Sequence, residues 1–164
     1  MIRLVIVASL LASCRVSLED NDTGNNGTDR VCTVNTSSPS CLEAETGNHS
    51  DLAWIESKIF TASCNFSGCH SSANDLGKLD LRPGMSHDNL VGVSSLLDPT
   101  RKLVVPNDIN SSYLMLMLQD VPPKMATPAG VLPSVGPMPQ GGTTLCCQKL
   151  DAIERWIMAG APGL

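Results

Sequence analysis

Cys64-Asn65-Phe66-Ser67-Gly68-Cys69-His70 is the stretch of sequence that decides how we expect this chain to fold. Its two cysteines have four residues between them, and a histidine follows the second cysteine directly. The related signature C-x-x-C-H has only two residues between its cysteines. The additional residues can loop outward without moving either sulfur, and Gly68 permits the tight or positive-φ turn that this loop needs. The stretch therefore predicts two thiols and an imidazole beside one another.

This order of Cys64, Cys69 and His70 is the one by which a chain binds haem covalently. Each thiol adds to one vinyl group of the porphyrin, and the histidine beside the second thiol is then held under the iron as its proximal ligand. We therefore predict haem c attached at Cys64 and Cys69, with His70 on the iron. A second interpretation is a small disulfide loop in an exported protein, with His70 an ordinary surface residue. A zinc site lacks an evident fourth ligand.

The N-terminus of the chain resembles a bacterial lipoprotein signal. Arg3 precedes an apolar stretch over residues 4–12, which is too short to span a bilayer as a helix, and small residues then precede Cys14. We expect residues 1–13 to be removed and lipid on Cys14 to anchor the chain in the bacterial cell envelope. A plain secretory peptide cut elsewhere is the alternative. Arg15 follows Cys14 where an inner-membrane retention signal would have aspartate, so the outer membrane is favoured.

The size and charge of the mature chain narrow its class. About 150 residues remain after cleavage, which is enough for one small domain. Because Arg3 leaves with the signal, 10 basic and 16 acidic residues remain and the net charge is −6. This acidity argues against nucleic acid as a partner. The aromatic residues are few for a core, and a haem would add apolar bulk; they are Trp54, Phe60, Phe66, Tyr113 and Trp156.

Residues 14–50 are rich in Asn, Asp, Gly, Thr and Ser, and their few apolar side chains cannot offset the entropy of ordering. We predict a flexible tether over 14–50 and one domain over 51–164. Four further cysteines are an even number in an oxidising compartment. We predict that Cys32 and Cys41 pair with Cys146 and Cys147, since adjacent helical residues point about 100° apart. A Cys32–Cys41 bridge is the main rival, and a bond between Cys146 and Cys147 is rarer.

The domain is predicted to be mainly α-helical, with long loops rich in Pro and Gly. The apolar spacing predicts a helix over residues 51–62, capped by Ser50 or Asp51, that leads directly into Cys64. A terminal amphipathic helix is predicted over 147–159, with Gly160 after it. Shorter helices are expected over 86–91, capped by Ser86, and from Asn110 or Ser111 to about 119. Residues 121–142 hold six prolines and four glycines, so we expect an irregular loop there.

A histidine-ligated haem iron in an electron-transfer protein commonly has a thioether as its other ligand. Met138 is the candidate, because Pro137 and Pro139 fix the backbone on both sides within the long loop. Met125 is the second choice, and His87 would give bis-histidine ligation. His49 falls in the predicted tether and is expected to be solvated. The methionines on helices are interpreted as core residues: Met115, Met117 and Met158.

The order of these elements resembles a class I cytochrome c, and more narrowly the cytochrome c-like domains of exported planctomycete and myxobacterial proteins. The resemblance extends over about residues 52–162. It implies that Cys64 and Cys69 carry the haem, that His70 and Met138 ligate the iron, and that the first and last helices pack together. The four-residue gap and the pair Cys146-Cys147 depart from the family pattern. The matching stretches are Cys69-His70-Ser71, Leu79-Asp80-Leu81, residues 89–93, Val105-Pro106, Ser112-Tyr113-Leu114, Met138-Pro139 and residues 153–161.

The sequence thus predicts a membrane-tethered, single-haem c-type cytochrome that transfers electrons by outer-sphere exchange with a redox partner protein. We expect an electron carrier and no enzyme, since the chain shows no distal histidine and arginine pair of the peroxidase kind, no phosphate-binding glycine loop and no zincin motif. The alternative function is a haem-free, disulfide-stapled binding domain at the cell surface.

Overall fold

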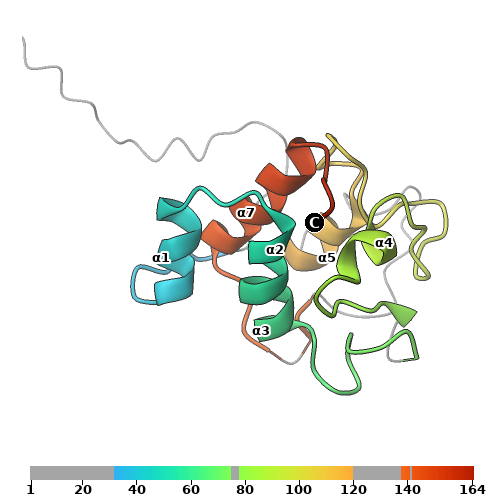
Figure 1. Ribbon diagram of the computed structural model, residues 1–164, viewed down its shortest axis with the longest axis horizontal. Helices are drawn as coiled ribbons and strands as arrows, with labels where there is room; N and C mark the ends of the chain where they lie inside the picture. Colours follow the sequence, from blue (N-terminus) through green and yellow to red (C-terminus); the bar gives the residue numbers. More distant parts are fainter. Residues whose placement is uncertain (1–31, 75–77, 120–137, 141) are drawn as a thin grey trace, which may run out of the picture.

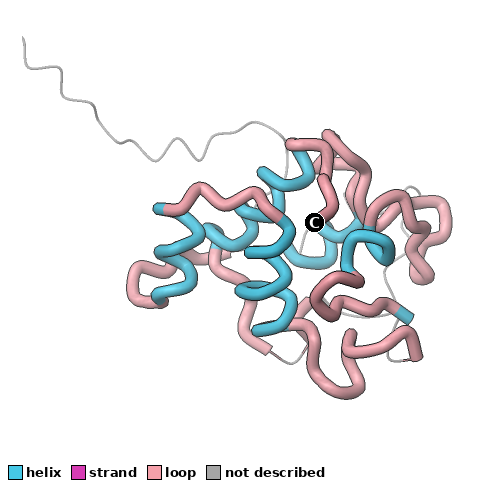
Figure 2. The backbone as a smooth tube through the Cα atoms, in the orientation of Figure 1, coloured by secondary structure: helices cyan, strands magenta, loops and turns pink. Residues whose placement is uncertain are grey.

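The computed structural model describes residues 32–74, 78–119, 138–140 and 142–164. Within these ranges the chain forms helices and no β-strand, so the predicted mainly α class is confirmed. Loops connect the helices, and Figure 2 shows how much of the domain they make up. The helical elements are α1 (Pro39–Thr46), α2 (Leu52–Ile55), η1 (Glu56–Phe60), α3 (Thr61–Ser63), α4 (Ser86–Leu90), α5 (Tyr113–Gln119) and α7 (Cys147–Met158).

The segments α2, η1 and α3 follow one another without a break and form the first long helix of the predicted domain (Figure 1). Asp51 caps it, since its carboxylate accepts the backbone N–H of Trp54 at 2.8 Å. The predicted helix over residues 51–62 and its Asp51 cap are therefore confirmed. The middle of this helix is a π-helical turn, a feature that is often found next to functional sites.

Helix α7 packs against α1, α2 and α5, and it joins the N-terminal and C-terminal parts of the domain (Figure 1). Its buried stripe includes Leu150, Ile153, Trp156 and Ile157, as the sequence predicted. The helix ends one residue before the predicted limit, and Gly160 follows with a φ of +93°. The contact between α2 and α7 places the first and last helices of the predicted domain together.

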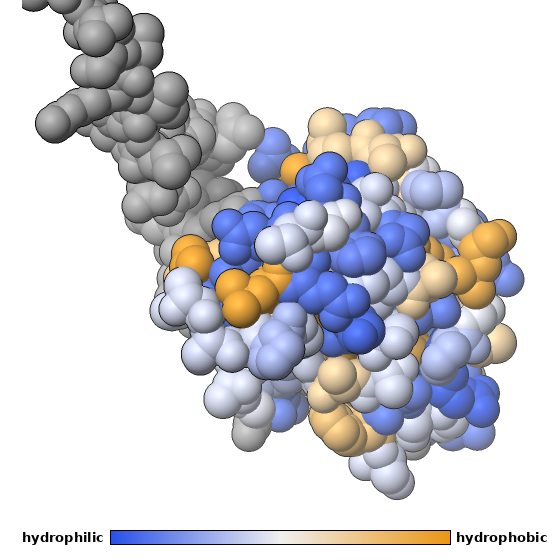
Figure 3. Space-filling view, turned by 60° about the vertical axis from the view of Figure 1, so that its left-hand side comes forward, coloured by the Kyte–Doolittle hydropathy of each residue, from blue (hydrophilic) through white to orange (hydrophobic). Residues whose placement is uncertain are grey.

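The hydrophobic core lies between these helices. Trp156, Tyr113 and Phe60 are its largest buried side chains, and Met115 of α5 is also buried, as predicted. Met158 was expected in the core, but 51% of its surface is exposed, because it lies in the last turn of α7, on the side away from the buried stripe. The surface is mostly hydrophilic on the face in Figure 3, where the exposed apolar side chains form separate small patches.

The predicted tether is wrong in its last part, because ordered structure begins well before residue 51. Residues 39–46 form α1, which starts at a proline after Ser38 and buries Cys41 and Ala44. Arg155 of α7 donates to the carbonyl oxygens of Ala44 at 2.9 Å and His49 at 3.0 Å. These contacts and two disulfides supply the stabilisation that the composition of this segment alone could not. Residues 14–31 of the predicted tether lie outside the described residues.

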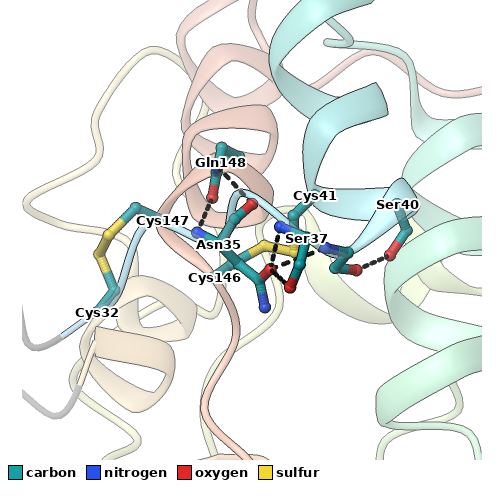
Figure 4. Close-up of a disulfide and its surroundings, with 9 residues drawn as sticks. Cys32, Asn35, Ser37, Ser40, Cys41, Cys146, Cys147 and Gln148 are labelled. Atoms are coloured by element: carbon teal, nitrogen blue, oxygen red, sulfur yellow. Dashed lines mark hydrogen bonds between the residues drawn. A yellow bond between two sulfur atoms is a disulfide. The ribbon is translucent and has the colours of Figure 1, made fainter.

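The two disulfides are Cys32–Cys147 and Cys41–Cys146, with Cα–Cα distances of 5.2 and 6.4 Å (Figure 4). The predicted pairing between the N-terminal cysteines and the vicinal pair is therefore confirmed. Cys146 immediately precedes α7 and Cys147 is its first residue, so the two sulfurs leave the helix start in different directions. The N-terminal segment is held along the start of the last helix.

The structure corrects two predictions, one about His49 and one about Ser86. His49 is not solvated in a tether: its ring stacks on Trp54 with centroids 4.4 Å apart and an interplanar angle of 8°. Ser86 does not cap the short helix: it is the first residue of α4, fully buried, and donates its hydroxyl to the carboxylate of Glu56. The contact between Ser86 and Glu56 joins residues 30 positions apart in the sequence, which local patterns do not reveal. His49 and Trp54 are close in the sequence, and they meet because the segment before residue 51 is ordered.

Glu56 is a buried carboxylate that fixes the turn before α4. Only 3% of its surface is exposed, and it accepts the Gly84 N–H at 2.9 Å and the Ser86 hydroxyl. The replacement Glu56→Ala would leave the buried Ser86 hydroxyl and the N–H of exposed Gly84 without their acceptor, so we expect it to lower the free energy of unfolding by on the order of 2 kcal/mol. Urea unfolding measures this, with Glu45→Ala on exposed α1 surface as the control. Equal losses in the two variants would contradict a special role for Glu56.

Candidate functional site

The loop from Cys64 to His70 begins where the first long helix ends. Cys64 follows α3, and the backbone N–H groups of Cys64 and Asn65 both donate to the carbonyl oxygen of Phe60 at 2.8 Å. Residues 66–68 are exposed, and the chain returns through a turn in which the Cys69 N–H donates to the Phe66 carbonyl at 2.9 Å. The additional residues of the motif therefore loop outward, as predicted.

Gly68 provides the turn that this outward loop needs. Its φ is +81°, a left-handed conformation that side chains disfavour, and a Cβ built there would meet no atom within 4 Å. The glycine is therefore required by the backbone conformation rather than by crowding. The expected positive-φ turn is confirmed.

Cys64 and Cys69 are both free thiols, and both are half-buried. The four other cysteines in the described part of the chain are all in disulfides. A Cys64–Cys69 disulfide, the second interpretation of the motif, is not formed in this structure. The site therefore offers two thiols on one short loop, in a domain that otherwise pairs its described cysteines.

The environment of Cys64 keeps it as a thiol at neutral pH. Burial raises the pKa of Cys64 to about 11, although the Lys149 ammonium opposes this shift; the nearby Cys69 raises it a little further. The side chain also packs against the hydrophobic core. Because the thiolate is the species that oxidises and binds metals, burial protects Cys64 from both reactions.

His70 is held by the segment that follows the loop. Its backbone carbonyl accepts the Leu81 N–H at 2.9 Å, and its Nδ1 atom is buried. Next to Leu81, Asp80 is 2% exposed and receives a two-point contact from Arg82, with the shortest distance 2.6 Å. These hydrogen bonds from Arg82 lower the pKa of Asp80 below its ordinary value. An ion pair therefore rigidifies the backbone that positions His70.

Met138 lies against the same core as Cys64, on the C-terminal side of the domain. It is half-buried, and its N–H donates to the carbonyl oxygen of Met117 on α5 at 2.7 Å. Most of the Pro- and Gly-rich loop before it, including Met125, lies outside the described residues. His87, the other alternative ligand, lies 3.2 Å from Asp88 and beside Gly163 near the C-terminus.

The structure also shows a functional candidate that the sequence analysis missed. Lys149, in the first turn of α7, is only 8% exposed, and its ammonium interacts with the Cys64 thiol. The sequence around Lys149 gives no local sign that this lysine is buried, so only the packing of α7 reveals it.

The described residues contain no group of three or more His, Cys, Asp or Glu side chains placed to hold a metal ion. A haem iron does not require such a group, because the porphyrin supplies four of its ligands. Among the helices of the described ranges, none is long and apolar enough to cross a membrane.

The chain was compared with models of protein families, with curated proteins and with solved structures, and none of them matches. The chemistry of the site therefore carries the functional argument.

The residues of this loop fit a covalently bound haem. Two free thiols flank an outward turn, an imidazole with a buried Nδ1 follows the second thiol, and a Cβ built at exposed Gly68 would meet no atom within 4 Å. Thiol addition to a vinyl group needs unpaired cysteines, which the loop provides. The residues that would hold the group are Cys64, Cys69 and His70.

Proposed function

We propose that the mature chain is a membrane-tethered, single-haem c-type cytochrome that transfers electrons by outer-sphere exchange. The observation that carries the proposal is the free state of Cys64 and Cys69 on one loop that ends in His70, in a domain whose other described cysteines form disulfides. When bound, haem c would supply a one-electron iron couple. No substrate chemistry is required, so the protein is an electron carrier and no enzyme.

The chain contributes attachment, orientation and exclusion of water. Cys64 and Cys69 would hold the group covalently: each thiol would supply its sulfur to one vinyl carbon and its proton to the other, with no change in redox state. The long helix that ends at Ser63 and the hydrogen bond from Leu81 to His70 fix the two ends of the attachment loop. The core beside Cys64 excludes water from one side of the site.

Met138 is the proposed sixth ligand of the iron. Two prolines fix the backbone around it, and the Met117 hydrogen bond holds this backbone against α5. A soft thioether stabilises reduced iron and raises the reduction potential. In vivo, lipid on Cys14 would keep the domain at the envelope membrane, with the outer membrane favoured, where a redox partner protein exchanges electrons with it.

The replacement Met138→Ala is expected to abolish the weak band that methionine ligation gives near the red end of the oxidised absorption spectrum, and to lower the reduction potential. Optical redox titration of haem-loaded protein measures both effects. Met158→Ala is the matched control, because Met158 is exposed in the last turn of α7, whereas Lys149, the neighbour of Cys64, lies in its first turn. If Met125→Ala removes the band while Met138→Ala leaves it intact, the assignment of Met138 is wrong.

A haem-free binding domain at the cell surface is the second candidate. The two disulfides favour it, because they fix the N-terminal segment to α7 without any cofactor. One absorption spectrum of protein matured with a cytochrome c assembly system separates the two functions. A Soret band that survives denaturation supports the cytochrome, and colourless protein supports the binding domain.

A further inference from the structure

A groove of about 510 Å³ lies on the side of the domain where the N-terminal segment meets the start of α7. Its walls are residues 33–38 and 143–146, and the disulfide Cys41–Cys146 borders it. Hydroxyl groups dominate the lining, and one lysine contributes to it. The hydroxyl residues include Thr33, Thr36, Ser38, Thr143 and Thr144, and the lysine is Lys149.

The first wall of the groove is fixed by a compact hydrogen-bond network (Figure 4). Asn35 donates its N–H to the Gln148 side chain, which donates back to the Asn35 carbonyl, both at 3.1 Å. The Asn35 side-chain oxygen accepts the N–H groups of Ser37 at 3.0 Å and Ser38 at 2.8 Å. With a disulfide on either side of this network, the groove is formed in advance of any ligand.

Lys149 is the charged group of the groove, and it has no counter-ion within the described part of the chain. It is 8% exposed, and no described carboxylate lies within ion-pair distance of its ammonium. Among the described residues, its electrostatic neighbour is Cys64, a neutral thiol at neutral pH. Burial of most of the side chain without an anion beside it disfavours the charged form. Burial accordingly lowers the pKa of Lys149 below its ordinary value.

The start of α7 adds to the positive potential around Lys149. This helix has twelve residues, and no side chain caps its N-terminus. The N–H groups of Cys147 and Lys149 donate to the carbonyl oxygens of Thr33 and Cys146 at 3.2 and 3.0 Å, so the helix dipole is what favours an anion at this end. Hydroxyl donors, a helix N-terminus and an uncompensated ammonium are together the recognition chemistry of a tetrahedral oxyanion.

We propose that this groove binds a phosphate group, with Lys149 as its counter-charge and the lining hydroxyls as further donors. The phosphate can come from free inorganic phosphate or from a lipid headgroup of the membrane to which the chain is tethered. None of the lining residues belongs to the attachment loop, and Lys149 joins the groove to that loop through its electrostatic contact with Cys64. The net charge of −6 of the mature chain disfavours non-specific anion binding, so saturable binding here identifies a specific site.

The test is a titration of isotope-labelled mature protein, with both disulfides intact, followed by backbone amide NMR at neutral pH. Sodium phosphate is added at constant ionic strength maintained with sodium chloride, and phosphatidylglycerol vesicles form a second arm. Residues 33–38 and 143–149 are expected to shift saturably. Lys149→Gln should weaken the affinity at least about tenfold, since it removes a charge-assisted hydrogen bond. Lys149→Arg should retain binding.

The matched control is Lys102→Gln, because Lys102 is exposed and its ammonium donates to Ser94 at 2.9 Å on another part of the surface. This variant should bind phosphate as the wild type does. A response to inorganic phosphate identifies a free oxyanion, and a response to vesicles alone identifies a lipid headgroup. The proposal is overturned if neither probe shifts the groove residues, or if Lys149→Gln responds as the wild type does.

Discussion

Mature protein with both Cys64→Ser and Cys69→Ser is expected to carry no covalent haem, whereas the wild type retains haem through denaturation. The hydroxyl of serine does not add to a vinyl group under conditions where a thiol does, so both thioether bonds are lost. Each single variant keeps one thiol of the pair and should show weaker attachment. Haem staining of denaturing gels and intact mass measure the outcome after maturation with a cytochrome c assembly system.

Ser67→Ala is the matched control for the cysteine replacements. Ser67 lies between the two cysteines in the exposed part of the same loop, so this variant tests whether any change in the loop disturbs attachment. It should stain as the wild type does. His70→Ala should keep the thiols but remove the proximal ligand, which changes the absorption spectrum. A colourless wild-type band with the mass of the bare polypeptide would falsify the cytochrome proposal.

The helices that carry a strong local signal were predictable from the sequence. Asp51 begins the first long helix because its side chain can reach the N–H three residues later, which is a local interaction. The stripe of α7 and Gly160 after its end likewise follow from spacing within one segment. Helix α1 was not predictable, because its amphipathic pattern is weak and α7 supplies its stability.

The candidate site divides in the same way. The attachment loop was predictable because its cysteines, glycine and histidine are contiguous, and the Gly68 conformation follows from the spacing. The burial of Lys149 and Glu56 was not predictable, because a charged residue in a helix is normally solvated and only tertiary packing buries these two side chains. It was predictable that each N-terminal cysteine pairs with one member of the vicinal pair, because adjacent helical residues point in different directions. Which cysteine pairs with which was not predictable from the sequence.

Removal of both disulfides is expected to lower the free energy of unfolding by more than the sum of the two single removals. The bonds close loops with sequence separations of 115 and 105 residues, and the second loop is nested inside the first with ten residues of difference. When one bond is removed, the other still closes the long loop, so only the entropy of a loop of about ten residues returns to the unfolded chain. That entropy corresponds to roughly 3 kcal/mol, whereas freeing the long loop as well brings the total to about 7 kcal/mol.

Guanidinium unfolding of Cys147→Ala, Cys146→Ala and the double variant tests this, with the unpaired partner cysteine also replaced by alanine in each case. The non-additivity of the two removals arises in the unfolded chain, so it should persist in variants that leave the folded contacts of α1 and α7 intact. The dependence of the unfolding free energy on guanidinium concentration should become steeper as each crosslink is lost. If the double variant loses only the sum of the single losses, the two bonds act through separate native contacts rather than through a shared loop. In that case the stability of α1 would depend on its packing against α7, including the two Arg155 hydrogen bonds, more than on the crosslinks.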